Sequence, residues 1–361
     1  MKIGFFSPLP PARSGVADYS ATLLSALRKI AEVETDAAGA DICLYHLGNN
    51  SLHRAVYQRA LERPGVAVIH DAVLHHFFLG SLTERAYIEE FRYNYGDWSE
   101  SLAADLWRNR ARSAADPAYF SYPMLKRIAQ NSIGLIVHNP GAEAMVRAHS
   151  PGARIFEIPH LHRAPELVHP ARLAFPARAF VFGVFGHLRE SKRVLPILRA
   201  FERVAAQTPA GLLLAGDFAS SDLERAVRPL LGRPGIFHTG YTPEDQFLRY
   251  AAACDACISL RYPAAGETSG ITIRLMGLGK PVILSSGPET SRFPAAACIR
   301  IDSGPAEEEM LEAAMLWLAT HRSEAREIGR RAADYIARSH DVDRAAAAYL
   351  EALTACYHQK Q

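Results

Sequence analysis

The sequence predicts an α/β protein made of two doubly wound, parallel-sheet domains, and three observations predict it. The chain has 361 residues, which suits two domains better than one. Short, almost continuously apolar segments alternate with helical patterns, as in parallel sheets covered on both faces. A Pro- and His-rich stretch without periodicity, residues 160–178, separates two such series. We expect a first domain at 1–165, a linker at 166–178, a second domain at 179–340, and a last helix at 341–361 that crosses back to the first domain.

Five strands are expected in the first half, each a run of apolar and β-branched residues bounded by polar or turn residues. They lie within 1–7, 41–48, 65–71, 133–139 and 153–159. The stretch 19–32 carries Leu23, Leu24, Leu27 and Ile30 at helical spacing, which predicts a helix after the first strand.

The second half repeats the pattern with five more strands. They lie within 179–186, 211–217, 236–241, 256–261 and 280–286. Three helices follow at 306–321, 323–339 and 342–358. In open parallel sheets ligands bind beyond the carboxyl ends of the strands, so the loops after the strands are the candidate site loops.

Composition excludes several classes of protein. The net charge is +2, too mild to imply nucleic acid. Neither a secretory signal nor an apolar stretch of about 20 residues is evident, so we expect a cytoplasmic protein, with a peripheral contact at the inner face of the membrane left open. Five scattered Cys do not suggest disulfides. Cys254 and Cys257 form a Cys-x-x-Cys, but without a second ligand pair we interpret them as buried structural residues and expect no metal site.

The segment 266–283, GETSGITIRLMGLGKPVI, predicts an anion site at a helix start. Ser269 is a good N-cap for a helix over 270–277, whose first free N–H groups attract anions. Glu267 lies beside these donors and could accept hydrogen bonds from sugar hydroxyls. Arg274, one turn inside the helix, leans back towards the same place. The competing interpretation is a capped helix whose Glu and Arg form a solvated ion pair of little energy.

Three further loops follow strands. The loop after 179–186 carries Arg189, Lys192 and Arg193, and clustered cations suit a diphosphate, although a basic solvent loop is also common. In the loop after the first strand, Gly15 is the point where the backbone could approach a ligand. His70 ends another strand and could hydrogen-bond a substrate, although a single His is more often structural.

Taken in order, these residues resemble the family 4 glycosyltransferases over nearly the whole chain. That family has the GT-B fold, two Rossmann-like domains facing across a cleft, and retains anomeric configuration. The resemblance implies a retaining hexosyltransferase that takes a sugar from a nucleotide-diphosphate sugar to a glycan or lipid-linked acceptor in bacterial-type surface polysaccharide synthesis. It implies neither a metal nor a cofactor besides the donor substrate, and no nucleic-acid partner.

The resemblance also assigns residues. It implies catalytic roles for His70, Lys192 and Glu267. Donor binding falls on Gly15, Gly186, His187, Arg189, Lys192, Tyr241, Glu267, Thr268, Ser269, Gly270, Ile271 and Arg274. Two positions depart from the family pattern. Arg274 replaces the second Glu of the Glu-x7-Glu motif, one residue early, and His187 stands where many members carry a phosphate-binding Arg.

Two other functions stay open. A degenerate GT-B protein that binds without turnover is favoured by the missing second Glu. A sugar-nucleotide epimerase would need carboxylates from both domains, and the first offers only Asp18 and Asp71 in its loops.

Residues 77–122 contain eleven of the 33 aromatic residues, interleaved with Arg108, Arg110 and Arg112. They predict either an acceptor or membrane surface or a helical insert with its own small core.

Overall fold

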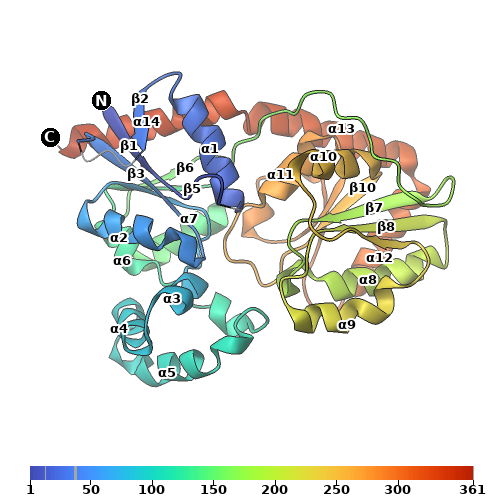
Figure 1. Cartoon of the computed structure of the whole chain (residues 1–361), viewed down its shortest axis with the longest axis horizontal. Coiled ribbons are helices and arrows are strands. Elements are labelled where there is room, and N and C mark those ends of the chain that lie inside the picture. The colour runs from blue at the N-terminus through green and yellow to red at the C-terminus, as the bar shows by residue number, and fades with distance from the viewer. Residues whose placement is uncertain (13, 36–38, 361) are drawn as a thin grey trace. The chain divides into compact units, whose positions relative to one another are not determined.

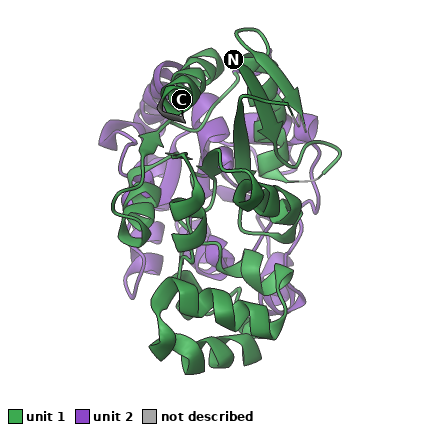
Figure 2. Cartoon of the chain, turned by 90° about the vertical axis from the view of Figure 1, so that its left-hand side faces the viewer, with its two compact units in different colours: residues 1–163, 263–268, 340–361 green, residues 164–262, 269–339 purple. Residues whose placement is uncertain are grey.

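The computed structural model describes residues 1–12, 14–35 and 39–360. The chain divides into two compact units, coloured separately in Figure 2. Unit 1 comprises residues 1–163, 263–268 and 340–361, and unit 2 comprises 164–262 and 269–339. The predicted linker, 166–178, lies at the start of unit 2. The short segment 263–268 belongs to unit 1 although unit 2 surrounds it in the sequence, and no sequence pattern marks it.

Unit 1 is built on a six-stranded, fully parallel sheet in the order β2-β1-β3-β4-β5-β6 (Figure 1). Its strands are β1 (Lys2–Phe6), β2 (Glu32–Thr35), β3 (Ile42–Leu47), β4 (Val66–Ile69), β5 (Gly134–Val137) and β6 (Ile155–Glu157). Apolar side chains alternate between two cores, one on each face. Leu44 of β3 enters one core, and its neighbour Tyr45 enters the other.

Unit 2 repeats this design with the order β12-β11-β10-β7-β8-β9, again fully parallel. Its strands are β7 (Phe180–Phe185), β8 (Ala210–Ala215), β9 (Ile236–His238), β10 (Ala256–Ser259), β11 (Val282–Ser285) and β12 (Ile299–Ile301). The two doubly wound parallel sheets confirm the predicted fold class.

All ten predicted strands are present, but the sequence analysis missed one strand in each sheet. β2 and β12 both lie at an edge of their sheet and are only four and three residues long. In β2 only Val33 is buried, so its sequence lacks the apolar run that marked the ten predicted strands. Short edge strands with charged side chains are common, because they discourage pairing with another chain.

Helices cover both faces of each sheet (Figure 1). Unit 1 contains α1 (Gly15–Leu27), α2 (Arg54–Glu62), α3 (His75–Ser81), α4 (Glu84–Tyr95), α5 (Glu100–Arg108), α6 (Lys126–Asn131), α7 (Pro140–His149) and α14 (Val342–Lys360). Unit 2 contains α8 (Val194–Ala205), α9 (Ser221–Leu231), α10 (Glu244–Ala253), α11 (Gly270–Gly277), α12 (Glu307–Thr320) and α13 (Arg322–Ser339).

The first helix differs from its prediction. It begins at Gly15, where Ser14 caps it by accepting a hydrogen bond from the Ala17 N–H, and it ends at Leu27. Ile30 therefore lies beyond the helix and is 47% exposed, contrary to its predicted place within the helix. The last helix, α14, belongs to unit 1 and packs against α1, where the Tyr19 and Tyr349 hydroxyls are 2.8 Å apart.

The aromatic segment 77–122 forms α3, α4, α5 and the short helices around them, and it has a core of its own. Tyr87, Phe91 and Tyr119 are fully buried. Of the eleven aromatic residues, only Tyr93 and Trp98 are among the exposed large apolar residues, at 38% and 71%. The packing therefore favours the helical-insert interpretation for most of the segment. None of the described helices is both long enough and apolar enough to cross a bilayer.

Candidate functional site

The start of α11 has the predicted form. The Ser269 side chain accepts a hydrogen bond from the Thr272 N–H at 3.2 Å and caps the helix. The Thr272 hydroxyl donates to Ser259 at the end of β10, which fixes the first turn to the sheet. Leu275 is fully buried, with Ile271 and Leu278 packed on the same core. The first amide groups of α11 remain available to an anion, because a helix start has no internal acceptors for them.

Lys192 lies beside this helix start. Its ammonium donates to the Phe185 carbonyl at the end of β7, and the residue is only 6% exposed. Gly186 follows with φ of +78°, and a side chain there would meet Ile271 of α11 and lie 3.1 Å from Lys192 Nζ. Gly186 thus leaves the space in which the ammonium and the first turn of α11 come together, both within unit 2.

The charges around this space favour a bound anion. Burial, with Arg261 and Arg189 nearby, holds the pKa of Lys192 well below its usual value. No carboxylate in the described part of the chain pairs with Lys192. Desolvation of the His187 ring, together with the nearby Arg189 and Lys192, lowers the pKa of His187. An anion placed here would offset the repulsion among these cations.

Glu267 and Thr268 lie in the segment 263–268, which packs in unit 1. A Glu267 carboxylate oxygen accepts from the Ala265 N–H at 2.7 Å. The Asn139 amide donates to the Gly266 carbonyl at 3.0 Å and to the Thr268 hydroxyl at 2.9 Å. Gly266 has φ of +70° and lies against Ala72, where a side chain would collide. Hydrogen bonds from Asn139 and packing against Ala72 therefore fix the turn that carries Glu267, just before α11 begins.

The sequence analysis missed Asn139. Its own side chain oxygen caps α7 by accepting from the Ala142 N–H at 2.8 Å, and Pro140 occupies the first helical position. The Asn-Pro pair is a recognisable helix start. Its second contact, with Gly266, joins residues 127 positions apart, and no local sequence pattern predicts it.

Arg274 is directed towards α10 in this structure. Its guanidinium pairs with Glu244 and lies 4.0 Å over the Phe247 ring. That Arg274 reaches the anion at the start of α11 stays a prediction. Tyr241, predicted to border the nucleotide base, is 56% exposed on the loop just before α10.

His70 and Gly15 are in unit 1. His70 follows β4, is 7% exposed, and its Nε2 lies 2.9 Å from Nδ1 of His46. Burial and the neighbouring histidines hold the pKa of His70 well below its usual value. Gly15 is the first residue of α1, and a side chain there would meet nothing within 4 Å. Asp71, one of the two carboxylates considered for an epimerase, accepts from the Asn49 N–H at 2.8 Å.

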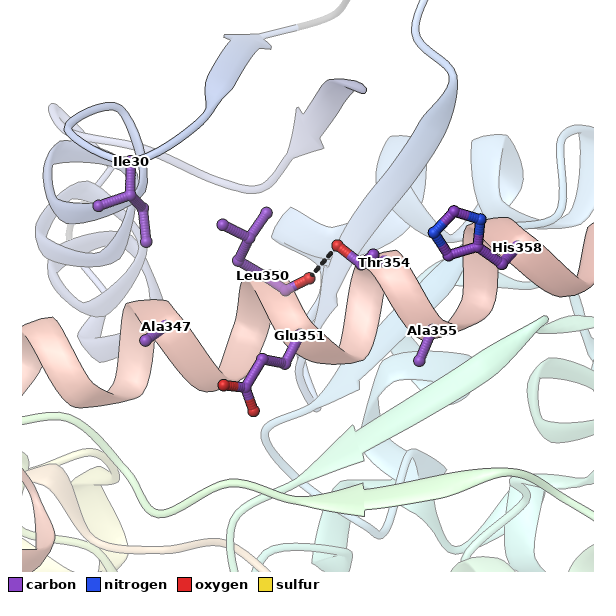
Figure 3. Close-up of a pocket in the computed structure, with 7 residues that line it drawn as sticks. All are labelled: Ile30, Ala347, Leu350, Glu351, Thr354, Ala355 and His358. Atoms are coloured by element: carbon purple, nitrogen blue, oxygen red, sulfur yellow. Dashed lines mark hydrogen bonds between the residues drawn. The ribbon is translucent and has the colours of Figure 1, made fainter.

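Two other features carry no site. Cys254 and Cys257 are buried free thiols, and no group of His, Cys, Asp and Glu among the described residues is arranged to hold a metal ion. An open groove of about 510 Å³ runs along α14. The residues that line it are labelled in Figure 3: Ile30, Ala347, Leu350, Glu351, Thr354, Ala355 and His358. None of the predicted site residues lines it.

Comparison with known proteins agrees with the fold. No protein-family model matches the chain, and no curated protein sequence does. Similar solved structures include sucrose-phosphate synthase from Thermosynechococcus elongatus, with a TM-score of 0.72, 15% identity and 99% of each chain covered. Anabaena Alr3699/HepE in complex with UDP-glucose gives a TM-score of 0.64 and 15% identity, covering 98% of this chain and 100% of that one.

A third similar structure is S. aureus TarM in complex with fondaparinux, α-GlcNAc-glycerol and UDP. It gives a TM-score of 0.58 and 14% identity, covering 93% of this chain and 59% of TarM. At these identities the likeness concerns the fold. The chain therefore has the two-domain GT-B fold that the sequence resemblance implied.

Proposed function

We propose that the chain is a retaining glycosyltransferase that transfers a sugar from a nucleoside-diphosphate sugar to a glycan or lipid-linked acceptor. One observation carries the proposal: the buried Lys192 ammonium lies beside the first turn of α11, at Gly186, without a carboxylate partner among the described residues. A fixed cation and a helix start together suit a diphosphate.

The proposed chemistry needs no side-chain nucleophile. The bond from the anomeric carbon to the diphosphate oxygen breaks, and the bond to the acceptor oxygen forms on the same face. The acceptor proton passes to the departing phosphate. Lys192 and the amides of α11 stabilise the charge that develops on the diphosphate, more strongly in the transition state than in the bound donor. Glu267 would orient the sugar through its hydroxyls, and no metal or cofactor is part of the proposal.

The first test is nucleotide binding. HepE and TarM were solved with UDP or UDP-glucose, so UDP is the first nucleotide to try, followed by GDP, ADP and TDP. A nucleotide at 100 times its dissociation constant should add about 2.7 kcal/mol to the free energy of unfolding. We expect Lys192→Ala to abolish this gain. Lys280→Ala is the matched control, because Lys280 also donates to backbone carbonyls in unit 2, those of Ala252 and Cys254.

The proposal is wrong if no nucleotide stabilises the protein, or if Lys192→Ala and Lys280→Ala bind equally well. Turnover is measured with labelled nucleotide sugars. Slow donor hydrolysis and transfer with retained anomeric configuration support a retaining transferase.

The alternative is a degenerate GT-B protein that binds a nucleotide sugar without turnover. It is favoured by Arg274, whose pairing with Glu244 places an ion pair where the family carries a second Glu. Binding without hydrolysis or transfer would support this alternative. Inversion at C2 of the sugar would instead support the epimerase.

The acceptor side and the role in surface polysaccharide synthesis are also proposals. We propose that the exposed Trp98 and Tyr93, together with the exposed Arg108, Arg110 and Arg112, contribute to acceptor or membrane contact on the helical segment 77–122. Co-sedimentation with anionic vesicles tests it, comparing the wild type with variants in which Arg108, Arg110 and Arg112 are Glu. Loss of binding in the variants supports a membrane surface, and no binding by the wild type rejects it.

A further inference from the structure

A row of histidines follows the carboxyl edge of the first sheet. His46 is the last but one residue of β3, His70 and His138 directly follow β4 and β5, and His160 lies three residues after β6. These four strands are neighbours in the sheet. Ring centroids are 5.2 Å apart for His46 and His70, 5.1 Å for His70 and His138, and 5.7 Å for His138 and His160. Tyr19 contacts all four rings. Only the sheet order brings these side chains together.

Backbone carbonyls fix the tautomers of several rings around this row. Nδ1 of His138 lies 2.8 Å from the Ile158 carbonyl, and Nδ1 of His53 lies 2.9 Å from the His46 carbonyl. A carbonyl only accepts, so the proton is on Nδ1 in both rings. Their Nε2 atoms are buried without a partner among the described residues, so each is an unsatisfied acceptor and not an unsatisfied N–H donor.

Similar reasoning decides which of His46 and His70 carries the proton that the two rings share. Nδ1 of His46 and Nε2 of His70 are 2.9 Å apart, so one carries the proton and the other accepts it. His46 is fully buried, and its Nε2 has no partner among the described residues. If His70 donated, the His46 proton would sit on that Nε2 as an unsatisfied buried N–H. If His46 donates, only a lone pair is left unsatisfied, which proteins tolerate more often than an unsatisfied N–H.

We propose that His46 is a positioning residue that keeps the proton of His70 on Nδ1, so that His70 offers an N–H to an oxygen of the substrate and does not act as a base. Of the two residues only His70 has exposed surface, 7% against 0% for His46. Ligands of open parallel sheets bind at this edge. That the acceptor is a sugar or phosphate oxygen rests on the proposed function; the tautomer does not.

Both rings are neutral at neutral pH, as the argument requires. Burial is the main reason that the pKa of His46 and of His70 lies well below the usual value, and neighbouring histidines lower it further. Each ring then carries a single proton, so the tautomer decides whether a free nitrogen donates or accepts.

The tautomer can be measured directly in the wild-type protein. Long-range ¹⁵N–¹H correlation spectra of ¹⁵N-histidine-labelled protein at pH 7.5 distinguish a proton on Nδ1 from one on Nε2. His70→Asn identifies the His70 signals by their loss. We expect His70 protonated on Nδ1. A proton on Nε2 overturns the proposal, whether or not the protein proves to be a transferase.

Variants at His46 then test its role. The asparagine amide can place an N–H close to the position of imidazole Nδ1, so His46→Asn should keep the His70 tautomer, whereas His46→Leu should lose it. We expect His46→Leu to lower kcat/KM about threefold to tenfold, the effect of one neutral hydrogen bond, and His46→Asn to restore most of it.

His75→Leu is the matched control, because His75 is equally buried in unit 1 but bonds to the Tyr87 hydroxyl. It should leave the His70 spectrum unchanged. The inference fails if His46→Leu keeps the Nδ1 proton, or if His46→Asn behaves like His46→Leu in the spectrum. Absence of transfer by the wild type would contradict the proposed function alone, and the spectrum would still decide the tautomer.

Discussion

At the scale of single residues, Lys192 shows how a binding group can oppose stability. Burial of its ammonium is only partly offset by one carbonyl, and Arg261 and Arg189 add repulsion. Because the pKa is lowered in the folded protein, the unfolded chain holds this proton more tightly. The charge therefore works against folding unless a ligand anion binds, and its cost falls as the pH rises from the folded pKa towards the usual value of 10.5.

We expect Lys192→Met to raise the free energy of unfolding of the ligand-free protein by about 1 kcal/mol, because an apolar chain of similar length replaces a buried charge. The same variant should bind no nucleotide. Urea denaturation with and without UDP measures both effects. Lys280→Met is the control and should give no gain, since it removes two carbonyl contacts. A loss of more than about 1 kcal/mol in Lys192→Met would show that the ammonium stabilises the fold.

At the scale of elements, the residue that caps the start of α7 has two roles. Asn139 caps the helix with its oxygen and holds the segment 263–268 with its nitrogen. The Val73 N–H donates to the Ala265 carbonyl at 3.0 Å, so the segment is anchored at a second point. These contacts explain why six residues between β10 and α11 belong to unit 1.

Two substitutions separate the two roles. Asn139→Ser can still cap α7 but is too short to reach Gly266, and we expect it to lower the free energy of unfolding by about 1 kcal/mol. Asn139→Ala also loses the cap, so we expect about 2 kcal/mol. Urea denaturation measures both. Equal losses would mean that the cap adds nothing, and no loss in Asn139→Ser would mean that the amide contacts with Gly266 and Thr268 add nothing.

At the scale of the whole molecule, buried neutral histidines make stability depend on pH. Burial is the main cause of the lowered pKa of His46, His70, His138 and His160, and for His138 the pKa is about 4 against 6.5 in the unfolded chain. As the pH falls below 6.5, the unfolded chain binds protons that the folded chain does not. The free energy of unfolding must therefore decrease as the pH falls.

We expect the free energy of unfolding to fall steeply between about pH 6.5 and 4.5, with His138 alone accounting for about 3 kcal/mol by pH 4. Carboxylates with lowered pKa, such as Glu327 at about 2, lose their contribution only below 4.5, so the two windows are separate. Urea denaturation at pH 7.5, 6.0 and 5.0 measures the slope. His138→Asn should make it shallower, and a flat profile above pH 5 would contradict the burial of neutral rings.

The sequence by itself determined the two parallel sheets, ten of the twelve strands that the structure describes, and the helix start at Ser269. These features follow from apolar strand segments that alternate with helical patterns, and from helix capping. Each of these signals spans only a few residues. Tertiary structure alone decided the edge strands β2 and β12, whose residues lack an apolar run. It also decided the meeting of Lys192 with α11, the hold of Asn139 on residues 263–268, and the histidine row. Those contacts join residues tens to more than a hundred positions apart, and strand order, which no local pattern encodes, brings them together.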